Sequence, residues 1–162
     1  MKLIKLILNI FSWGAIGVLV VMALYVVTSN YQVFGGYRSF LIQSGSMEPS
    51  IMTGDIIVTK SQNSYILNDV TAFHSENRIV THRIIAKEEK PEGVQFSTKG
   101  DANRSQDFDT ITPSQIIGKV VLVIPKLGYL VAFSKTLPGF LILVLIPTLL
   151  FLLDELFKMK NA

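Results

Sequence analysis

The chain has 162 residues, enough for one domain with attached segments, and 49% of them are hydrophobic. Cysteine is absent and histidine occurs only twice, which excludes disulfides and leaves too few ligands for a structural zinc site, so no cofactor is expected. The formal net charge is +3, but basic and acidic residues nearly balance between residues 29 and 136, which argues against a nucleic-acid partner.

Residues 1–28 are predicted to be an N-terminal membrane anchor. No charged side chain occurs between residues 6 and 37, and the apolar run over residues 6–28 is long enough to cross a hydrocarbon core of about 30 Å as a helix. The run exceeds the ~7–15 apolar residues of a cleaved signal peptide, and no small-x-small cleavage site follows it. We therefore expect the segment to be retained as an anchor.

A second apolar run, over residues 137–153, is predicted to be a C-terminal transmembrane helix, because prolines such as the two it contains are tolerated in spanning helices. Lysines lie at the outer end of each run, at positions 2, 5, 158 and 160. The positive-inside rule then places both ends in the cytoplasm, including a tail over residues 154–162. Residues 29–136 are expected outside the cell, against membrane lipid, in a multi-pass protein of the plasma membrane.

Short β-branched and apolar runs separated by turn-forming residues fill the segment between the two spans. The predicted strands cover residues 55–60, 69–73, 78–86, 94–99 and 116–124. A hydrophilic hairpin loop is predicted at residues 87–93, and residues 100–112 are expected to be turn-rich. This spacing, without a helical period between the spans, predicts a mainly β fold: a small antiparallel barrel or sandwich flanked by membrane helices.

Ser46 lies in the sequence SGSMEP, residues 44–49, which is typical of a turn. A serine hydroxyl is a weak nucleophile unless a base activates it, and the base in turn needs an orienting group. His82 shares a strand face with Val80 and Ile84, so its side chain is predicted to point inward, where the imidazole is suited to act as a base. His74 is expected at the surface. The acidic candidates are Asp101, Asp107 and Asp109, and spacing alone does not choose among them.

Four motifs in this order resemble the type I signal peptidases, specifically the endoplasmic-reticulum-like branch that also occurs in archaea and some Gram-positive bacteria. The motifs are residues 44–49, residues 54–58, residues 79–84, and residues 99–103 with an aspartate six residues past Asp101. The chain departs from the family at Ala102, where asparagine usually follows the aspartate directly.

The resemblance implies a serine endopeptidase that removes signal peptides from exported preproteins after small residues. It assigns Ser46 as nucleophile and His82 as general base, at the position where most bacterial members have lysine. Asp107 then orients the histidine and Asp101 supports the site. The Ser44 hydroxyl and the Ser46 backbone N–H are expected to hold the oxyanion, and no metal is implied.

Two other interpretations remain. Repressor-type self-cleaving serine proteases have a similar fold, but they use a lysine base and are soluble with a DNA-binding domain, so the anchor and His82 count against them. From a different class, the chain would be a non-catalytic, membrane-tethered assembly module for secreted or fibre proteins. That alternative predicts that replacing Ser46 has no effect. Eukaryotic members of the resembled family need accessory subunits, and this sequence identifies none.

Overall fold

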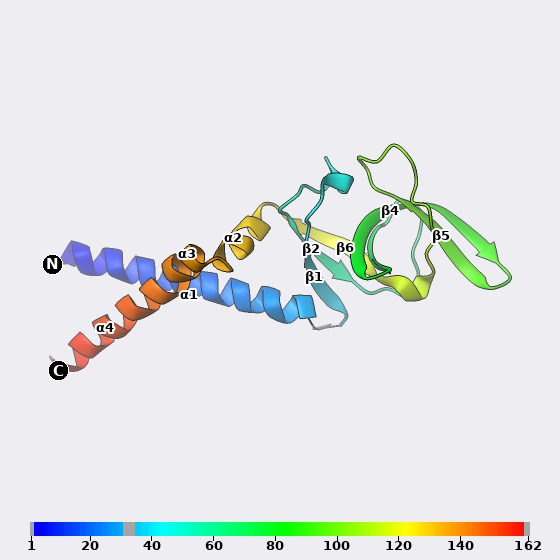
Figure 1. Cartoon of the computed structure of the whole chain (residues 1–162). Helices are drawn as coiled ribbons and strands as arrows, with labels where there is room; N and C mark the ends of the chain where they lie inside the picture. The colour runs from blue at the N-terminus through cyan, green and yellow to red at the C-terminus, as the bar shows by residue number, and fades with distance from the viewer. Residues whose placement is uncertain (1, 31–34, 161–162) are drawn as a thin grey trace. The chain divides into compact units, whose positions relative to one another are not determined.

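The computed structural model describes residues 2–30 and 35–160 (Figure 1). It divides into two compact units, one formed by Val27–Gly128 and the other by Met1–Val26 with Tyr129–Ala162. Residues 31–34, in the segment expected outside the cell, and residues 161–162, in the predicted tail, lie outside the described residues. So do Met1 and the side chains of the four lysines used to predict orientation.

The unit Val27–Gly128 contains six strands that form one antiparallel sheet in the order β1-β2-β6-β3-β4-β5. Their bounds are β1 Tyr37–Leu41, β2 Ile56–Lys60, β3 Val70–Ser75, β4 Arg78–Lys90, β5 Gly93–Lys99 and β6 Ile116–Ile124. Two short 3-10 turns, η1 (Gly45–Met47) and η2 (Pro113–Gln115), interrupt the connections. The antiparallel β domain predicted from the spacing of the short runs is therefore confirmed.

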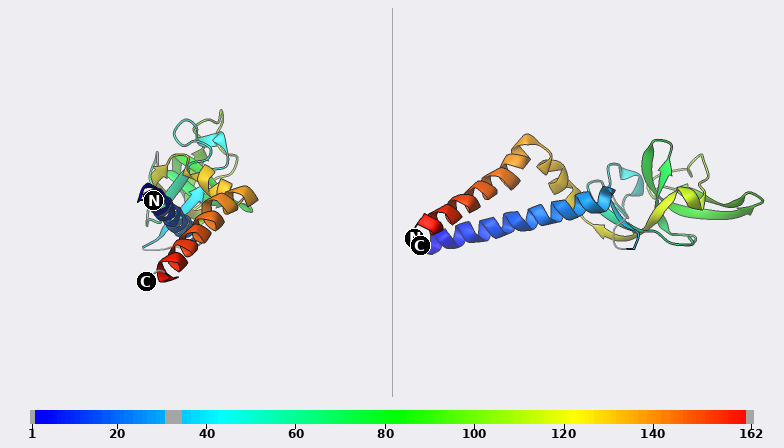
Figure 2. Two further views of the ribbon diagram at one scale, coloured as in Figure 1. Left: turned by 90° about the vertical axis from the view of Figure 1, so that its left-hand side faces the viewer. Right: turned by 90° about the horizontal axis from the view of Figure 1, so that it is seen from below.

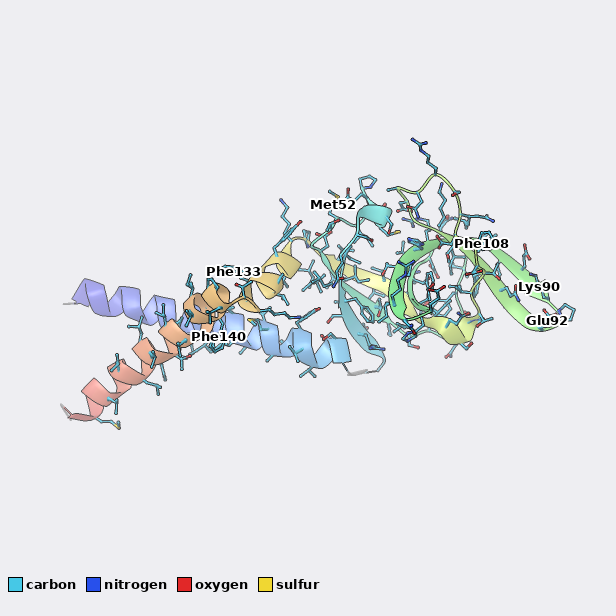
Figure 3. All side chains as sticks on the ribbon, viewed as in Figure 1. Met52, Lys90, Glu92, Phe108, Phe133 and Phe140 are labelled. Carbon is cyan, nitrogen blue, oxygen red and sulfur yellow. The ribbon has the colours of Figure 1, made fainter. Side chains whose placement is uncertain are left out.

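The hairpin between β4 and β5 corrects the loop predicted at residues 87–93. Lys87 pairs with Phe96 and Lys90 with Gly93, so the strands continue almost to the tip, where Figure 3 labels Lys90 and Glu92. Side chains on this extension are largely exposed, so the sequence lacks the apolar alternation of a half-buried strand. Gly93, at φ +120°, supplies the backbone conformation that the tight turn requires.

Two groups of buried apolar side chains hold the sheet. The first, which we call the distal core, consists of Tyr65, Phe73, Ile84, Phe96, Ile111 and Ile116. The second, the proximal core, consists of Ile42, Met47, Ile51, Ile57 and Ala72. Their members come from strands and connecting turns alike, so burial fixes the turns as firmly as the strands.

The remaining unit is helical. Its elements are α1 (Lys2–Asn30), α2 (Leu127–Ser134), α3 (Leu137–Phe140), the π-helical turn η3 (Leu141–Leu145) and α4 (Ile146–Lys160). The end of α1 and the start of α2 fall within Val27–Gly128, the unit that contains the sheet and that we call the β unit. The chain bends between α2 and α3 (Figure 2), where the Thr136 hydroxyl caps α3 by accepting the Gly139 N–H at 3.1 Å.

Within the described residues, no single helix combines the length and apolarity needed to cross a membrane. The pair Leu127–Ser134 and Leu137–Leu153 meets the requirement of length and composition together, with a 97° bend, and Ile16–Ser29 is a shorter apolar stretch. Both segments that were expected to span are helical. Their crossing of a membrane, and the domain boundaries derived from it, stay predictions.

Candidate functional site

Ser46 lies in η1, and its backbone is held by two parts of the β unit. Its neighbour Met47 is 1% exposed and belongs to the proximal core. The Ser46 carbonyl accepts the Ala102 N–H at 2.9 Å. A Cβ on Gly100 would come within 2.5 Å of that carbonyl oxygen, so this approach requires glycine. The turn that carries the Ser46 hydroxyl is therefore docked on the loop that follows β5.

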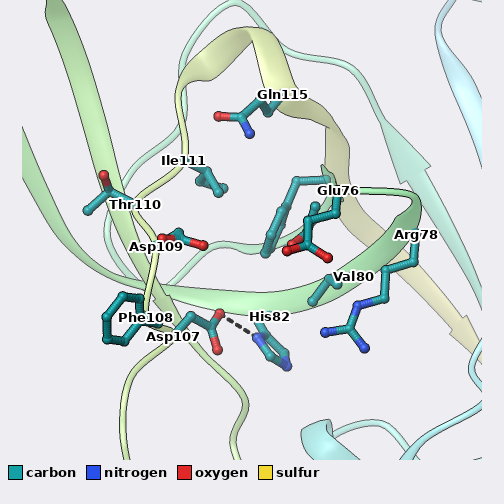
Figure 4. Close-up of a pocket in the computed structure, with 12 residues that line it drawn as sticks. Glu76, Arg78, Val80, His82, Asp107, Phe108, Asp109, Thr110, Ile111 and Gln115 are labelled. Atoms are coloured by element: carbon teal, nitrogen blue, oxygen red, sulfur yellow. Dashed lines mark hydrogen bonds and ion pairs between the residues drawn. The ribbon is translucent and has the colours of Figure 1, made fainter.

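His82 on β4 is 8% exposed, which confirms the predicted inward orientation. Its Nδ1 lies 2.6 Å from Oδ2 of Asp107, drawn as a dashed line in Figure 4. A carboxylate accepts hydrogen bonds and does not donate them, so this contact places the imidazole proton on Nδ1 and leaves the lone pair on Nε2. A histidine held in this tautomer presents Nε2 as a base.

Asp107 is positioned by Thr98, a residue that the sequence reasoning missed. The Thr98 hydroxyl donates to Asp107 Oδ2 at 2.6 Å, and the Asp107 N–H donates to the Thr98 carbonyl at 2.8 Å. The same segment then pairs with β5 again, through two backbone bonds between Phe96 and Ile111. Thr98 is fully buried and alternates with buried Phe96 along β5. Because Phe96 and Thr98 are two residues apart on one strand, alternation predicts that both point inward. A polar side chain at such an inward position would have identified Thr98 as a candidate.

Asp101 pairs with Arg83, the residue after His82. Nε and Nη2 of Arg83 donate to the two carboxylate oxygens at 2.8 and 2.6 Å, and Nη1 donates to the Asn68 carbonyl at 3.0 Å. The hydrogen bond from Arg83 lowers the pKa of Asp101 below its ordinary value, and a hydrogen bond from Ser50 acts in the same direction against the effect of burial. The same pair raises the pKa of Arg83. The hydrogen bonds from Arg83 and Ser50 thus keep Asp101 ionised, although Ala102 replaces the asparagine that usually follows this aspartate.

A series of contacts links the turn that carries Ser46 to the strand that carries His82. Gly100 and Ala102 touch Ser46, Asp101 between them binds Arg83, the residue after His82, and η1 contacts β4. Among the described residues, the hydrogen-bond partner of Ser46 Oγ is Ser44 Oγ at 3.4 Å, and none joins Ser46 to His82. Bonds between a nucleophile and its base are often loose before substrate binds.

The other two candidates from the sequence take no part in this network. His74 is exposed on β3, as expected. Asp109 is also exposed, and it has no hydrogen bond or ion pair within the described part of the chain. The structure therefore pairs His82 with Asp107, a choice that residue spacing left open among three carboxylates.

The Asp101–Arg83 pair predicts a specific pH dependence of stability. Asp101→Asn is expected to lower the free energy of unfolding by about 2 kcal/mol at neutral pH, because it removes the ionised partner of a partly buried guanidinium. Since folding lowers the pKa of Asp101, its carboxylate stabilises the fold above the unfolded-state pKa of about 3.9 and loses this effect as the pH falls through the folded-state pKa. The difference between wild type and variant should therefore shrink below about pH 4.

Urea unfolding of both proteins in detergent between about pH 2.5 and pH 7 measures this difference. A difference that stayed constant down to the lowest pH would contradict the assignment of the effect to the ionised Asp101 carboxylate.

A serine in a turn that is docked on the loop containing Asp107, combined with a His–Asp pair, is an arrangement suited to nucleophilic hydrolysis. No protein-family model matches the chain. It is 33% identical over 122 residues to signal peptidase I W of Bacillus subtilis, covering 72% of this chain and 64% of that protein. The chain is therefore similar to type I signal peptidases of both bacterial and eukaryotic origin. The resemblance expected from the four motifs is confirmed at this level.

Eukaryotic relatives match a shorter stretch. The signal peptidase complex catalytic subunit SEC11 of Metarhizium acridum is 28% identical over 101 residues, covering 55% of this chain and 59% of that protein. The SEC11 subunit of Saccharomyces cerevisiae is 29% identical over 102 residues, with 56% and 61% covered. The chain thus spans about three fifths of the length of these curated relatives.

Proposed function

We propose that the protein is a membrane-bound serine endopeptidase that removes signal peptides from exported preproteins after small residues. The observation that carries the proposal is the 2.6 Å contact between His82 Nδ1 and Asp107 Oδ2, which leaves Nε2 as a base. The loop that contains Asp107 is also the loop on which the Ser46 turn is docked. The similarity to signal peptidases supports the same reaction, since the relatives named above carry that activity in their names.

In this mechanism Ser46 Oγ attacks the carbonyl carbon of the scissile peptide bond, and His82 Nε2 takes the hydroxyl proton. Asp107 stabilises the imidazolium that forms and keeps its ring oriented. The imidazolium then protonates the leaving amine, which frees the mature protein and leaves the signal peptide as an ester on Ser46. Water, activated by the same imidazole, hydrolyses that ester.

The oxyanion of each tetrahedral intermediate is stabilised by the Ser46 backbone N–H and the Ser44 hydroxyl. The proximity of the two serine hydroxyls, 3.4 Å apart, supports this role for Ser44. A preorganised donor of this kind lowers the barrier by about 3 kcal/mol. Asp101, held by Arg83 and docked under Ser46 through Gly100 and Ala102, supports the turn.

Membrane attachment belongs to the same proposal. Residues 1–28 and 137–153 anchor the chain, both ends lie in the cytoplasm, and residues 29–136 act outside the plasma membrane. The uncharged apolar runs and the lysines at their outer ends support this topology. Attachment raises the local concentration of a membrane-held preprotein at the site. Substrate signal peptides and membrane lipid are then the partners, and any accessory subunit would have to be found by co-purification.

Thr98→Val is expected to reduce kcat about tenfold with little change in KM, because Asp107 loses one of the two donors to Oδ2 and no longer holds His82 as firmly. Thr98→Ser keeps the hydroxyl and should restore most of the activity, whereas a purely structural role would make both variants alike. The measurement is steady-state cleavage of a preprotein, with the pH profile of kcat/KM. Wild-type kinetics in Thr98→Val would contradict the positioning role.

The function is tested with the full chain, purified in detergent, and a membrane-inserted preprotein with small residues one and three positions before the cut. The proposal expects release of the mature protein and loss of release when either small residue is replaced by a bulky one. If no preprotein is cut while the chain remains folded, the proposal is contradicted in favour of the non-catalytic assembly module. Cleavage at sites unrelated to small residues would contradict the substrate assignment.

A further inference from the structure

A cavity of about 560 Å³ opens beside the His82–Asp107 pair, near the turn that joins β3 to β4 (Figure 4). Both members of the pair lie in its wall, and Phe73, Val80 and Ile111 supply apolar surface. Neither Ser44 nor Ser46 is among the described residues that line it. A volume of this size holds one or two side chains of a peptide.

The position of the cavity relates it to one half of the substrate. When the scissile bond breaks, the residues before the cut remain attached to Ser46, whereas the residues after the cut leave from the amine that His82 protonates. The leaving segment therefore begins next to His82. The cavity shares His82 and Asp107 but neither serine, so a segment that extends from the leaving amine past His82 can enter it, whereas the acylated segment is held at Ser46.

We propose that this cavity binds the first side chains of the mature protein after the cut and that Glu76 and Asp109 make it prefer a basic over an acidic side chain. The proposal rests on the proposed function of the same site. It adds a preference for the residues that follow the cut, which is separate from the small residues that precede it.

The charges of the lining residues carry the preference. Figure 4 shows the carboxylates of Glu76 and Asp109 turned toward the space between them. Within the described residues neither forms an ion pair, whereas the charge of Asp107 is already met by His82 and Thr98. Arg78 is the single lysine or arginine among the residues lining the cavity. The two available carboxylates therefore outnumber the one cation.

The shape suits the same kind of side chain. Phe73 and Ile111 are 3% and 4% exposed, so they form a firm apolar floor below the charged rim. Lysine and arginine place an apolar stem on such a surface while the charged end reaches the carboxylates near solvent. A glutamate in the same place would bring a third negative charge to Glu76 and Asp109, which is unfavourable.

The test compares three versions of one preprotein, with alanine, lysine or glutamate at the first two positions after the cut, each cleaved by the full chain in detergent. Wild type is expected to show a kcat/KM about tenfold higher for the lysine than for the glutamate version, and the ratio should fall at high salt. Glu76→Gln combined with Asp109→Asn should bring the ratio to about twofold or less. Arg78→Gln should increase it.

Glu92→Gln is the matched control, because Glu92 is an exposed carboxylate at the tip of the β4–β5 hairpin, outside the cavity. This variant should keep the wild-type ratio of the lysine to the glutamate version. Equal rates for lysine and glutamate in wild type, or an unchanged ratio in the double variant, would overturn the preference while cleavage of the alanine version leaves the proposed function intact. If none of the three versions is cut, the proposed function and this inference fail together. The opposite shift expected from Arg78→Gln keeps the proposal testable if the double variant does not fold.

Discussion

Ser46→Ala is expected to lower kcat/KM for preprotein cleavage by a factor of about 10⁴ or more, because the acyl-enzyme cannot form without the hydroxyl. The turn itself should persist. Met47 remains in the proximal core, and the Ser46 carbonyl still accepts the Ala102 N–H. The hydroxyl contributes one long contact to Ser44, so the free energy of unfolding should change by less than about 0.5 kcal/mol.

The measurement is the rate of mature-protein release by wild type and variant, with urea unfolding to verify the fold. Ser105→Ala removes an exposed hydroxyl from the loop that carries Asp101 and Asp107 and should behave like wild type. Retention of more than a few per cent of the activity in Ser46→Ala would show that another residue is the nucleophile. A complete loss in both serine variants would point instead to sensitivity of the loop.

Asp107→Asn is expected to lower kcat by a factor of about 10³ to 10⁴. In wild type, Oδ2 accepts from His82 Nδ1 and from the Thr98 hydroxyl. An amide nitrogen at that place donates to Nδ1 and moves the imidazole proton to Nε2, where the base is needed. The volume of the side chain hardly changes, so the loss would reflect the tautomer of His82 and not a cavity.

The pH profile of kcat/KM distinguishes this effect from misfolding, since a changed tautomer alters the profile while the unfolding curve stays close to that of wild type. Glu88→Gln, which neutralises an exposed carboxylate on β4 outside the site, is the control and should retain full activity. Activity of Asp107→Asn within tenfold of wild type would contradict the assignment of Asp107. His82→Ala would then show whether the histidine acts without this carboxylate.

Several features of the site were predictable from the sequence because they depend on neighbours along the chain. Glycine and proline around Ser46 predicted a turn, and alternation with Val80 and Ile84 predicted an inward His82. The same dependence on neighbouring residues explains why the hairpin extension over residues 87–90 was not predicted. Its side chains are exposed and polar, so they show no alternation of apolar and polar residues. A local sequence pattern indicates which face of a strand is buried, and it cannot identify a strand of which neither face is buried.

The sequence by itself determined the apolar segments, the antiparallel β domain, the reactive residue types and their order along the chain. Only the tertiary structure decided which carboxylate binds which base. His82 and Asp107 lie 25 residues apart, and Arg83 and Asp101 lie 18 apart. These pairings depend on the loop after β5 folding back along that strand through the Phe96–Ile111 bridge. Hydrogen bonding and burial across the sheet select the partner, and no spacing rule encodes that geometry.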